Sequence, residues 1–189
     1  MKIKVGISNH HVHLKQNDLE ILFGKDFKLE KKQDLVQPKE FASTSKVTLK
    51  GPKGQIDNVR VLGPIRNYSQ VEISRTDSYI LGLNPPVRNS GDLLNSSYIT
   101  IVGPKGQVTL NEGCIIANRH IHLTKENRIE LGLVNVDKVK IKISNEKGGI
   151  LDNVYLKESE KFKLECHLDT DDGNANLLKT GDEVEIVKE

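Results

Sequence analysis

Tryptophan is absent from this chain, and four phenylalanines and four tyrosines make up its 4% of aromatic residues. Aliphatic side chains therefore have to form most of any core. Cysteine is also scarce, because Cys114 and Cys166 are the only two and neither belongs to a Cys-x-x-Cys pair. The two could in principle form one disulfide, but we expect reduced thiols, as is usual in a cytosolic protein.

Long apolar runs and charge of one sign are missing as well. No stretch approaches the roughly 18 apolar residues of a membrane-spanning helix, and the alternating N-terminal residues do not resemble a signal peptide. Lys and Arg number 28 against 26 Asp and Glu, and the net charge of +2 is spread along the chain. We therefore expect a soluble, cytoplasmic protein with no membrane and no nucleic-acid partner.

The loops and motifs of the common nucleotide-binding and nucleophilic enzymes are also absent. The sequence has no G-x-G-x-x-G or Walker-type loop, and no signature of a Ser-His-Asp or Cys-His arrangement. Its two Gly-Pro-Lys-Gly segments, 51–54 and 103–106, are typical of β-hairpin turns rather than of phosphate-binding loops.

The sequence does contain extensive β-strand patterning. Apolar and polar residues alternate in runs that Gly, Pro and Asn clusters separate: 3–7, 47–49, 59–61, 71–73, 99–101, 139–143 and 184–186. Many short strands with tight turns predict barrels or sandwiches. We expect short helices over 15–23, before Gly24, and after the N-cap Thr124, ending at Gly132.

An internal repeat runs through the chain. Residues 5–14 match residues 114–123, and residues 46–59 match residues 138–154. Each copy reads as a strand, a His-x-His motif, a short helix and a β-hairpin, and a chance match of this length and order is improbable. The repeat predicts two related domains.

Each copy carries two histidines at a spacing that suits metal binding. Residues i and i+2 of an extended segment point to one face, so His11 and His13 can converge on one ion, as can His120 and His122. Imidazole nitrogen is a preferred zinc ligand. One such motif is more often a pair of surface or core-edge histidines, but two copies at equivalent positions favour a metal site.

Zinc needs further ligands, for which the sequence offers candidates. His167 stands at a strand end before an acidic turn, and Glu72 lies between two apolar residues of a strand. By themselves, His167 equally fits a surface histidine, and Glu72 better fits a solvated strand face. Arg66 follows a Gly-Pro turn and is either a surface arginine or a residue that holds phosphate bidentately.

Taken together, the motifs resemble those of the PduL-type phosphate acyltransferases, also called phosphate propanoyltransferases. The resemblance runs from about residue 5 to residue 187 and rests on the segments 8–14, 61–67, 70–77, 118–123 and 162–175. It implies a mainly β fold of two small β-barrel domains, each capped by short α-helices. A central barrel would span 10–117, and a second would span 118–189 and include the N-terminal strand 1–9.

The resemblance also implies what each candidate residue binds. It implies two zinc ions per chain, one held by His11, His13, Glu72 and the substrate sulfur, the other by His120, His122, His167 and water. Arg66 matches the phosphate-binding arginine of the family. Less specific matches place Ser8, Arg60, Leu62 and Asn174 at positions that contact coenzyme A.

The implied reaction converts a short-chain acyl-CoA, propanoyl-CoA or acetyl-CoA, and phosphate to acyl phosphate and coenzyme A, with phosphate itself as the nucleophile. Two alternatives use the same histidines: a zinc hydrolase of esters or amides, and a non-enzymatic metal-binding interaction module. We further expect a homodimer, and an acetate or propionate kinase as a pathway partner.

The chain departs from the family in two places. The family commonly has Arg before the first His-x-His, as Arg119 precedes the second, but this chain has His10, which could compete as a ligand or change the charge beside it. Members destined for bacterial microcompartments often carry an additional N-terminal helix, whereas this sequence starts in its first strand. We therefore expect a free cytoplasmic enzyme rather than an encapsulated one.

Overall fold

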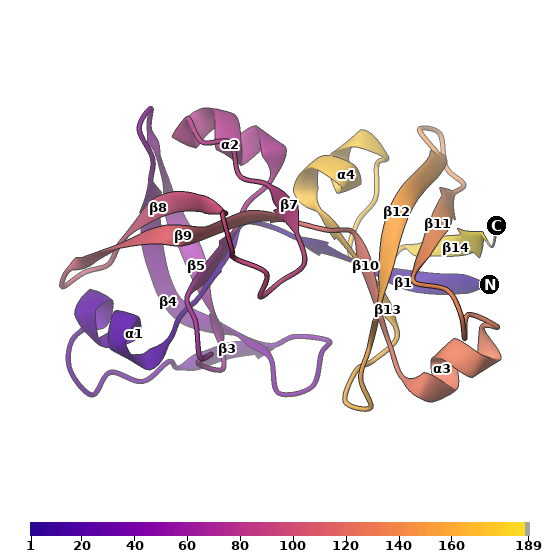
Figure 1. Ribbon diagram of the computed structural model, residues 1–189, viewed down its shortest axis with the longest axis horizontal. Helices are drawn as coiled ribbons and strands as arrows, with labels where there is room; N and C mark the ends of the chain where they lie inside the picture. The colour runs from indigo at the N-terminus through magenta and orange to yellow at the C-terminus, as the bar shows by residue number, and fades with distance from the viewer. Residues whose placement is uncertain (188–189) are drawn as a thin grey trace. The chain divides into compact units, whose positions relative to one another are not determined.

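The computed structural model describes residues 1–187, which form two compact units. The central unit is His10–Ala117, and the terminal unit combines Met1–Asn9 with the chain from Asn118 onward. Strands dominate both units and the helices are short (Figure 1). The predicted mainly β fold of barrels with short helices is therefore confirmed. Within residues 1–187, every helix is too short or too polar to cross a bilayer.

The central unit contains a closed ring of paired strands. Each strand of the ring pairs with the next in the order β4 (Phe41–Lys50), β5 (Gln55–Gly63), β2 (His11–His13), β6 (Gln70–Glu72), β9 (Gln107–Ala117) and β8 (Ser97–Val102), and β8 pairs with β4. Strand β3 (Lys31–Asp34) adds to β4, and β7 (Val87–Arg88) adds to β9. The helices of this unit are α1 (Gln16–Phe23) and α2 (Arg75–Leu81).

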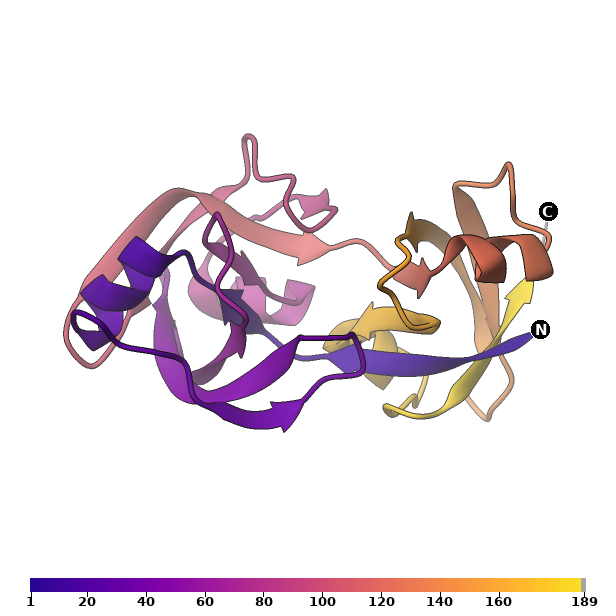
Figure 2. The ribbon, with the colours of Figure 1, turned by 90° about the horizontal axis from the view of Figure 1, so that it is seen from below.

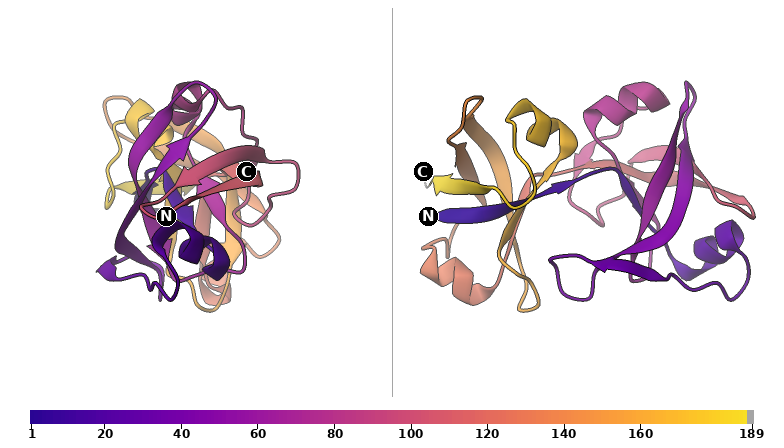
Figure 3. Two further views of the ribbon diagram at one scale, coloured as in Figure 1. Left: turned by 90° about the vertical axis from the view of Figure 1, so that its left-hand side faces the viewer. Right: turned by 180° about the vertical axis from the view of Figure 1, so that it is seen from behind.

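The terminal unit repeats this ring. Its closed barrel has the order β1 (Lys2–Ser8), β13 (Glu165–Asp169), β10 (His120–Leu123), β12 (Gly149–Glu158), β11 (Lys138–Ile143) and β14 (Glu183–Val187). Strands β1 and β14 run antiparallel, side by side (Figure 3). The helices are α3 (Lys125–Glu130) and α4 (Thr170–Ala175). Strand β10 pairs parallel with β12 and antiparallel with β13, just as β2 pairs with β5 and β6, so the duplication is visible in the topology.

Strand alternation decides which side chains fill each barrel. Val12 and Leu14 belong to the aliphatic core of the central unit, and Ile121 and Leu123 to that of the terminal unit. Successive side chains of a strand point to opposite faces. The histidines that alternate with these core residues therefore point away from the barrel interior.

The Gly-Pro-Lys-Gly segments are hairpin turns, as predicted, and they also hold the ends of two helices. The backbone N–H of Lys105 donates to the carbonyl of Leu22 at 3.0 Å, and that of Lys53 donates to Leu81 at 3.1 Å. Figure 2 shows α1 beside the tip of the β8–β9 hairpin. Glycine is required at Gly103 because a Cβ there would overlap the backbone of Leu22. These contacts satisfy helix C-terminal carbonyls that have no partner within the helix.

Candidate metal centres

The first group of candidate ligands lies in the central unit and is called centre 1. It comprises His11 and His13 on β2 and Glu72 on β6, whose ligand atoms all lie within 4.8 Å of one another. Across the β2–β6 pair, His11 stands directly opposite Glu72, and its Nε2 is 3.5 Å from Glu72 Oε2. Ligands about 2.1 Å from a tetrahedral zinc ion lie about 3.4 Å apart, so this spacing suits one ion.

His13 of centre 1 is prepared to bind a cation as a neutral ring. Burial lowers the pKa of His13 well below its usual value, and the charges of His11 and Arg66 lower it further. The Nδ1 atom of His13 is buried and has no hydrogen-bond partner among the described residues. An unpaired buried polar atom is unfavourable, and metal coordination would remove this penalty.

Glu72 is held in place rather than solvated. Its side chain is only 13% exposed, so the solvated strand face that periodicity favoured does not apply. The Nε2 atom of Gln70 donates to Glu72 Oε1 at 2.6 Å and to Ser90 Oγ at 2.8 Å. The backbone N–H of Gly91 donates to Gln70 Oε1 at 2.7 Å. The loop after β7 thus fixes the amide that orients the Glu72 carboxylate.

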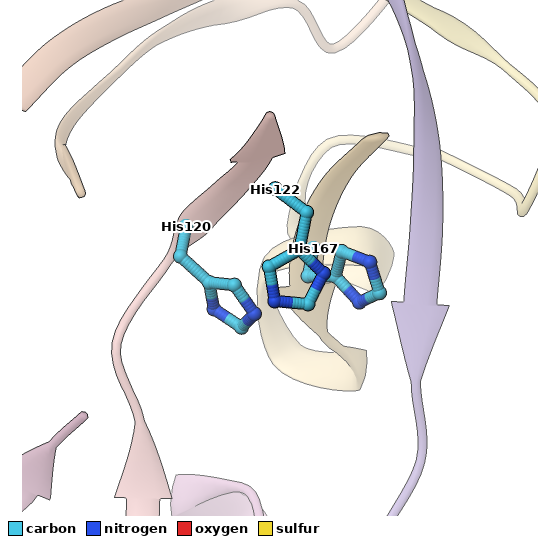
Figure 4. Close-up of side chains that lie close together, drawn as sticks. All are labelled: His120, His122 and His167. Atoms are coloured by element: carbon cyan, nitrogen blue, oxygen red, sulfur yellow. The ribbon is translucent and has the colours of Figure 1, made fainter. Parts of the chain in front are cut away.

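The second group lies in the terminal unit and is called centre 2. It comprises His120 and His122 on β10 and His167 on β13, again with ligand atoms within 4.8 Å of one another. His120 stands directly opposite His167 across the antiparallel β10–β13 pair. Figure 4 shows the three rings gathered at one point, and their centroids are 4.6 to 5.0 Å apart.

Burial also keeps His120 and His122 of centre 2 neutral. It lowers the pKa of His122 to about 3, with smaller contributions from the charges of His167 and Lys157. Burial lowers the pKa of His120 as well, and Lys157 again adds to the effect. The Nδ1–H of His120 donates to the carbonyl of Asn118 at 2.7 Å, which leaves Nε2 with a lone pair for a metal.

Arg66 lies beside centre 1 and already binds an acidic group. Its backbone N–H donates to the carbonyl of Leu14 at 3.0 Å, directly after the His-x-His strand. Its Nη2 atom is 3.2 Å from Glu40 Oε1, and its Nη1 atom donates to Ser90 Oγ at 3.2 Å and to Tyr68 OH at 3.4 Å. The guanidinium is therefore positioned near the candidate ligands, with a carboxylate as one of its partners.

The four residues expected at coenzyme A are divided between the units. In the central unit, Arg60 and Leu62 stand opposite His11 and His13 across the parallel β2–β5 pair, next to centre 1. In the terminal unit, Ser8 ends β1 and is half-buried, and Asn174 is exposed on α4. What these four residues bind stays a prediction.

His10 belongs to neither group of candidate ligands. Its Nδ1 atom lies 3.2 Å from each carboxylate oxygen of Asp77, which caps the N-terminus of α2. Arg119 has the matching place in the terminal unit, where two guanidinium nitrogens each lie 2.7 Å from a carboxylate oxygen of Asp172. Sequence reasoning identified the replacement of Arg by His, but not these carboxylate partners on later helices.

Known proteins resemble this chain over nearly its whole length. A family model described as phosphate propanoyltransferase matches residues 4–179. A curated protein of that name from Thermotoga maritima is 49% identical over 187 residues, which are 98% of this chain and 89% of that protein. The one from Rhodopseudomonas palustris is 43% identical and is matched over 99% of this chain and 83% of its own length. That from Priestia megaterium is 49% identical, with 95% and 83% covered.

Proposed function

Because this chain belongs to the phosphate propanoyltransferase family, and so is an acyltransferase, we propose that it transfers the acyl group of a short-chain acyl-CoA to inorganic phosphate. The products would be an acyl phosphate and free coenzyme A. The observation that carries the proposal is Arg66, a candidate phosphate ligand, placed beside a group of candidate metal ligands. Propanoyl is the acyl group in the relatives' name. Acetyl is one methylene shorter, and because one methylene is worth only about 1 to 3 kcal/mol of discrimination, acetyl-CoA is the alternative substrate.

We propose that each centre binds one zinc ion. Two histidines with a carboxylate, and three histidines, are both ligand sets that zinc commonly uses. Both centres contain buried ring nitrogens that have no hydrogen-bond partner within residues 1–187, and these nitrogens support the proposal. When bound, zinc would polarise the thioester carbonyl and stabilise the departing thiolate.

Arg66 would hold the phosphate nucleophile. A guanidinium binds phosphate through two parallel hydrogen bonds, which fixes both its distance and its direction of attack. Glu40 occupies one guanidinium nitrogen in the ligand-free protein, and its side chain is 36% exposed. A half-buried ion pair that water still reaches is weak, so phosphate can replace the carboxylate.

Neither cysteine is suited to carry the acyl group. Cys114 and Cys166 are both fully buried, and burial raises the pKa of each thiol to about 12. The thiolate is the nucleophilic form of cysteine, and almost none is present near neutral pH at such a pKa. Direct attack by phosphate needs no acylated cysteine and agrees with this chemistry.

The proposal is tested by incubating the zinc-loaded protein with propanoyl-CoA, with and without phosphate. Free thiol and hydroxylamine-trapped acyl phosphate are measured together. We expect both products in equal amounts, and only when phosphate is present. Equal thiol release without phosphate, and no acyl phosphate, would identify a hydrolase instead. No release under either condition would favour a metal-binding module. The homodimer and the kinase that would consume the acyl phosphate stay predictions.

A further inference from the structure

The β10–β13 strand pair places four side chains at the corners of a square on one face. His120 stands opposite His167, and His122 stands opposite Glu165. Three of these residues make up centre 2, and Glu165 is the fourth corner. Glu165 is only 5% exposed, and a buried carboxylate is unfavourable unless a partner compensates it. The Glu165 carboxylate therefore needs a partner close by.

That partner is the imidazole of His167. Glu165 Oε2 lies 2.9 Å from His167 Nε2, although the contact does not meet the geometry of a hydrogen bond in the described chain. Space for the carboxylate comes from Gly6, which stands opposite His167 on the neighbouring strand β1. A Cβ at Gly6 would lie 3.1 Å from both Cδ and Oε1 of Glu165. The Glu165 carboxylate thus extends along His167 toward β1, whereas His120 lies on the β10 side.

Centre 1 has an equivalent contact in which the roles of hydrogen-bond donor and acceptor are exchanged. Gln70 stands opposite His13 in the register in which Glu165 stands opposite His122. Gln70 is fully buried, and its amide donates to the Glu72 carboxylate at 2.6 Å. Where the third candidate ligand is a carboxylate, the neighbouring residue is a donor. Where the third candidate ligand is an imidazole, the neighbouring residue is an acceptor. The third candidate ligand and its neighbour both differ between the two copies of the repeat, yet in each copy these two side chains are in contact.

We propose that Glu165 is a positioning residue that orients His167 for metal binding at centre 2. Its carboxylate would accept the Nε2–H of His167, which leaves Nδ1 as the nitrogen for the metal. Histidines that bind metals usually donate their other ring N–H to a carboxylate or carbonyl, and losing that partner lowers metal affinity about 10- to 100-fold. This role rests on the proposed function, because it requires that centre 2 binds zinc.

The test compares wild type with Glu165→Gln, which keeps the side-chain size and removes the charge. Zinc affinity is measured by competition with a chelator on the full-length protein. We expect the affinity for one ion to fall about 10- to 100-fold and that for the other to stay unchanged. Gly6→Ala, which displaces the carboxylate without altering a candidate ligand, should weaken the same ion. Glu183→Gln, exposed on β14 of the same unit, is the control and should retain both affinities.

Retention of both ions by Glu165→Gln with wild-type affinity would overturn this role. An equal loss at both ions, together with a lower melting temperature of the metal-free protein, would show that Glu165 only supports the fold and would overturn it as well. Wild-type protein that binds no zinc would overturn both this role and the two-zinc proposal. That last outcome is distinguishable because it appears before any variant is made.

Discussion

Glu72 lies directly opposite His11 across the β2–β6 strand pair, with its Oε2 atom 3.5 Å from His11 Nε2. The equivalent register of the β10–β13 strand pair places His167 opposite His120 in the terminal unit. The third candidate ligand of each centre therefore occupies the same position of the repeat. One copy has a carboxylate there and the other an imidazole, so the two centres share an origin but differ in chemistry.

His11→Ala should remove a ligand from centre 1 and leave centre 2 intact. We expect bound zinc to fall from about two ions per chain to about one, because a site with two remaining protein ligands holds zinc weakly. Elemental analysis of the purified protein measures this directly. His10→Ala is the matched control, since His10 contacts Asp77 instead, and should keep both ions. Unchanged zinc in His11→Ala would rule out His11 as a ligand.

Arg66→Ala should lose turnover while retaining zinc. Removing one preorganised electrostatic contact typically lowers the rate about 10²- to 10³-fold, and we expect at least that loss in acyl phosphate formation. Arg75→Ala, an exposed arginine on α2 of the same unit, should behave like wild type. Near-normal acyl phosphate formation by Arg66→Ala would remove Arg66 from the mechanism.

Glu40→Gln should lower the KM for phosphate. Glu40 pairs with the guanidinium that phosphate is expected to bind, and an ion pair at this exposure is worth up to about 1 kcal/mol, or about fivefold in affinity. The value of kcat should not change. Steady-state kinetics at varied phosphate measure both quantities, with Glu30→Gln as an exposed control in the same unit. A higher KM would mean that Glu40 positions Arg66 rather than competing for it.

Acid should destabilise the metal-free protein. Burial lowers the pKa of His13, His120 and His122, so the unfolded chain takes up protons below its ordinary histidine pKa of about 6.5 while the folded protein does not. The free energy of unfolding should therefore decrease as pH falls below about 6.5, by roughly 1.4 kcal/mol per pH unit for each histidine at most. Urea unfolding at pH 7.5 and pH 5.5 measures this. A free energy that stays constant or increases on acidification would contradict the burial of neutral rings.

Local patterns were sufficient to predict much of the secondary structure. Helix α1 ends at Phe23 because Gly24 adopts a φ of 107°, and α3 follows Thr124, which caps it together with Asn127. The alternating runs form strands, and both Gly-Pro-Lys-Gly segments form hairpin turns. Each of these features depends on residues close together in the sequence, which is why the sequence alone reveals them.

Other elements carry too little local signal. Helices α2 and α4 are about as short as α3 and each has a capping residue, Ser74 and Asp169, but neither follows a His-x-His motif as α1 and α3 do. Strand β3 is exposed along its whole length, and β7 has two residues. Such strands form because a neighbouring strand provides backbone hydrogen bonds, which sequence periodicity does not report.

The candidate ligands show the same division. Spacing within one strand predicts the two His-x-His motifs as ligand pairs, whereas only the family resemblance predicts Glu72 and His167 as the third ligands. Periodicity alone favoured a solvated face for Glu72, because it does not show that β6 pairs with β2 and buries that face. Glu165 precedes His167 by two residues, so the same i, i+2 spacing was available as a signal. Glu40 became visible only in the fold, because it contacts a residue 26 positions away.

Zinc titration into metal-depleted protein links the metal to the reaction. Phosphate-dependent release of thiol from propanoyl-CoA is followed while zinc is added in fractions of an equivalent. A two-zinc phosphate acyltransferase predicts no release without metal, and full activity at about two equivalents per chain. Full phosphate-dependent turnover by the metal-depleted protein would contradict that function.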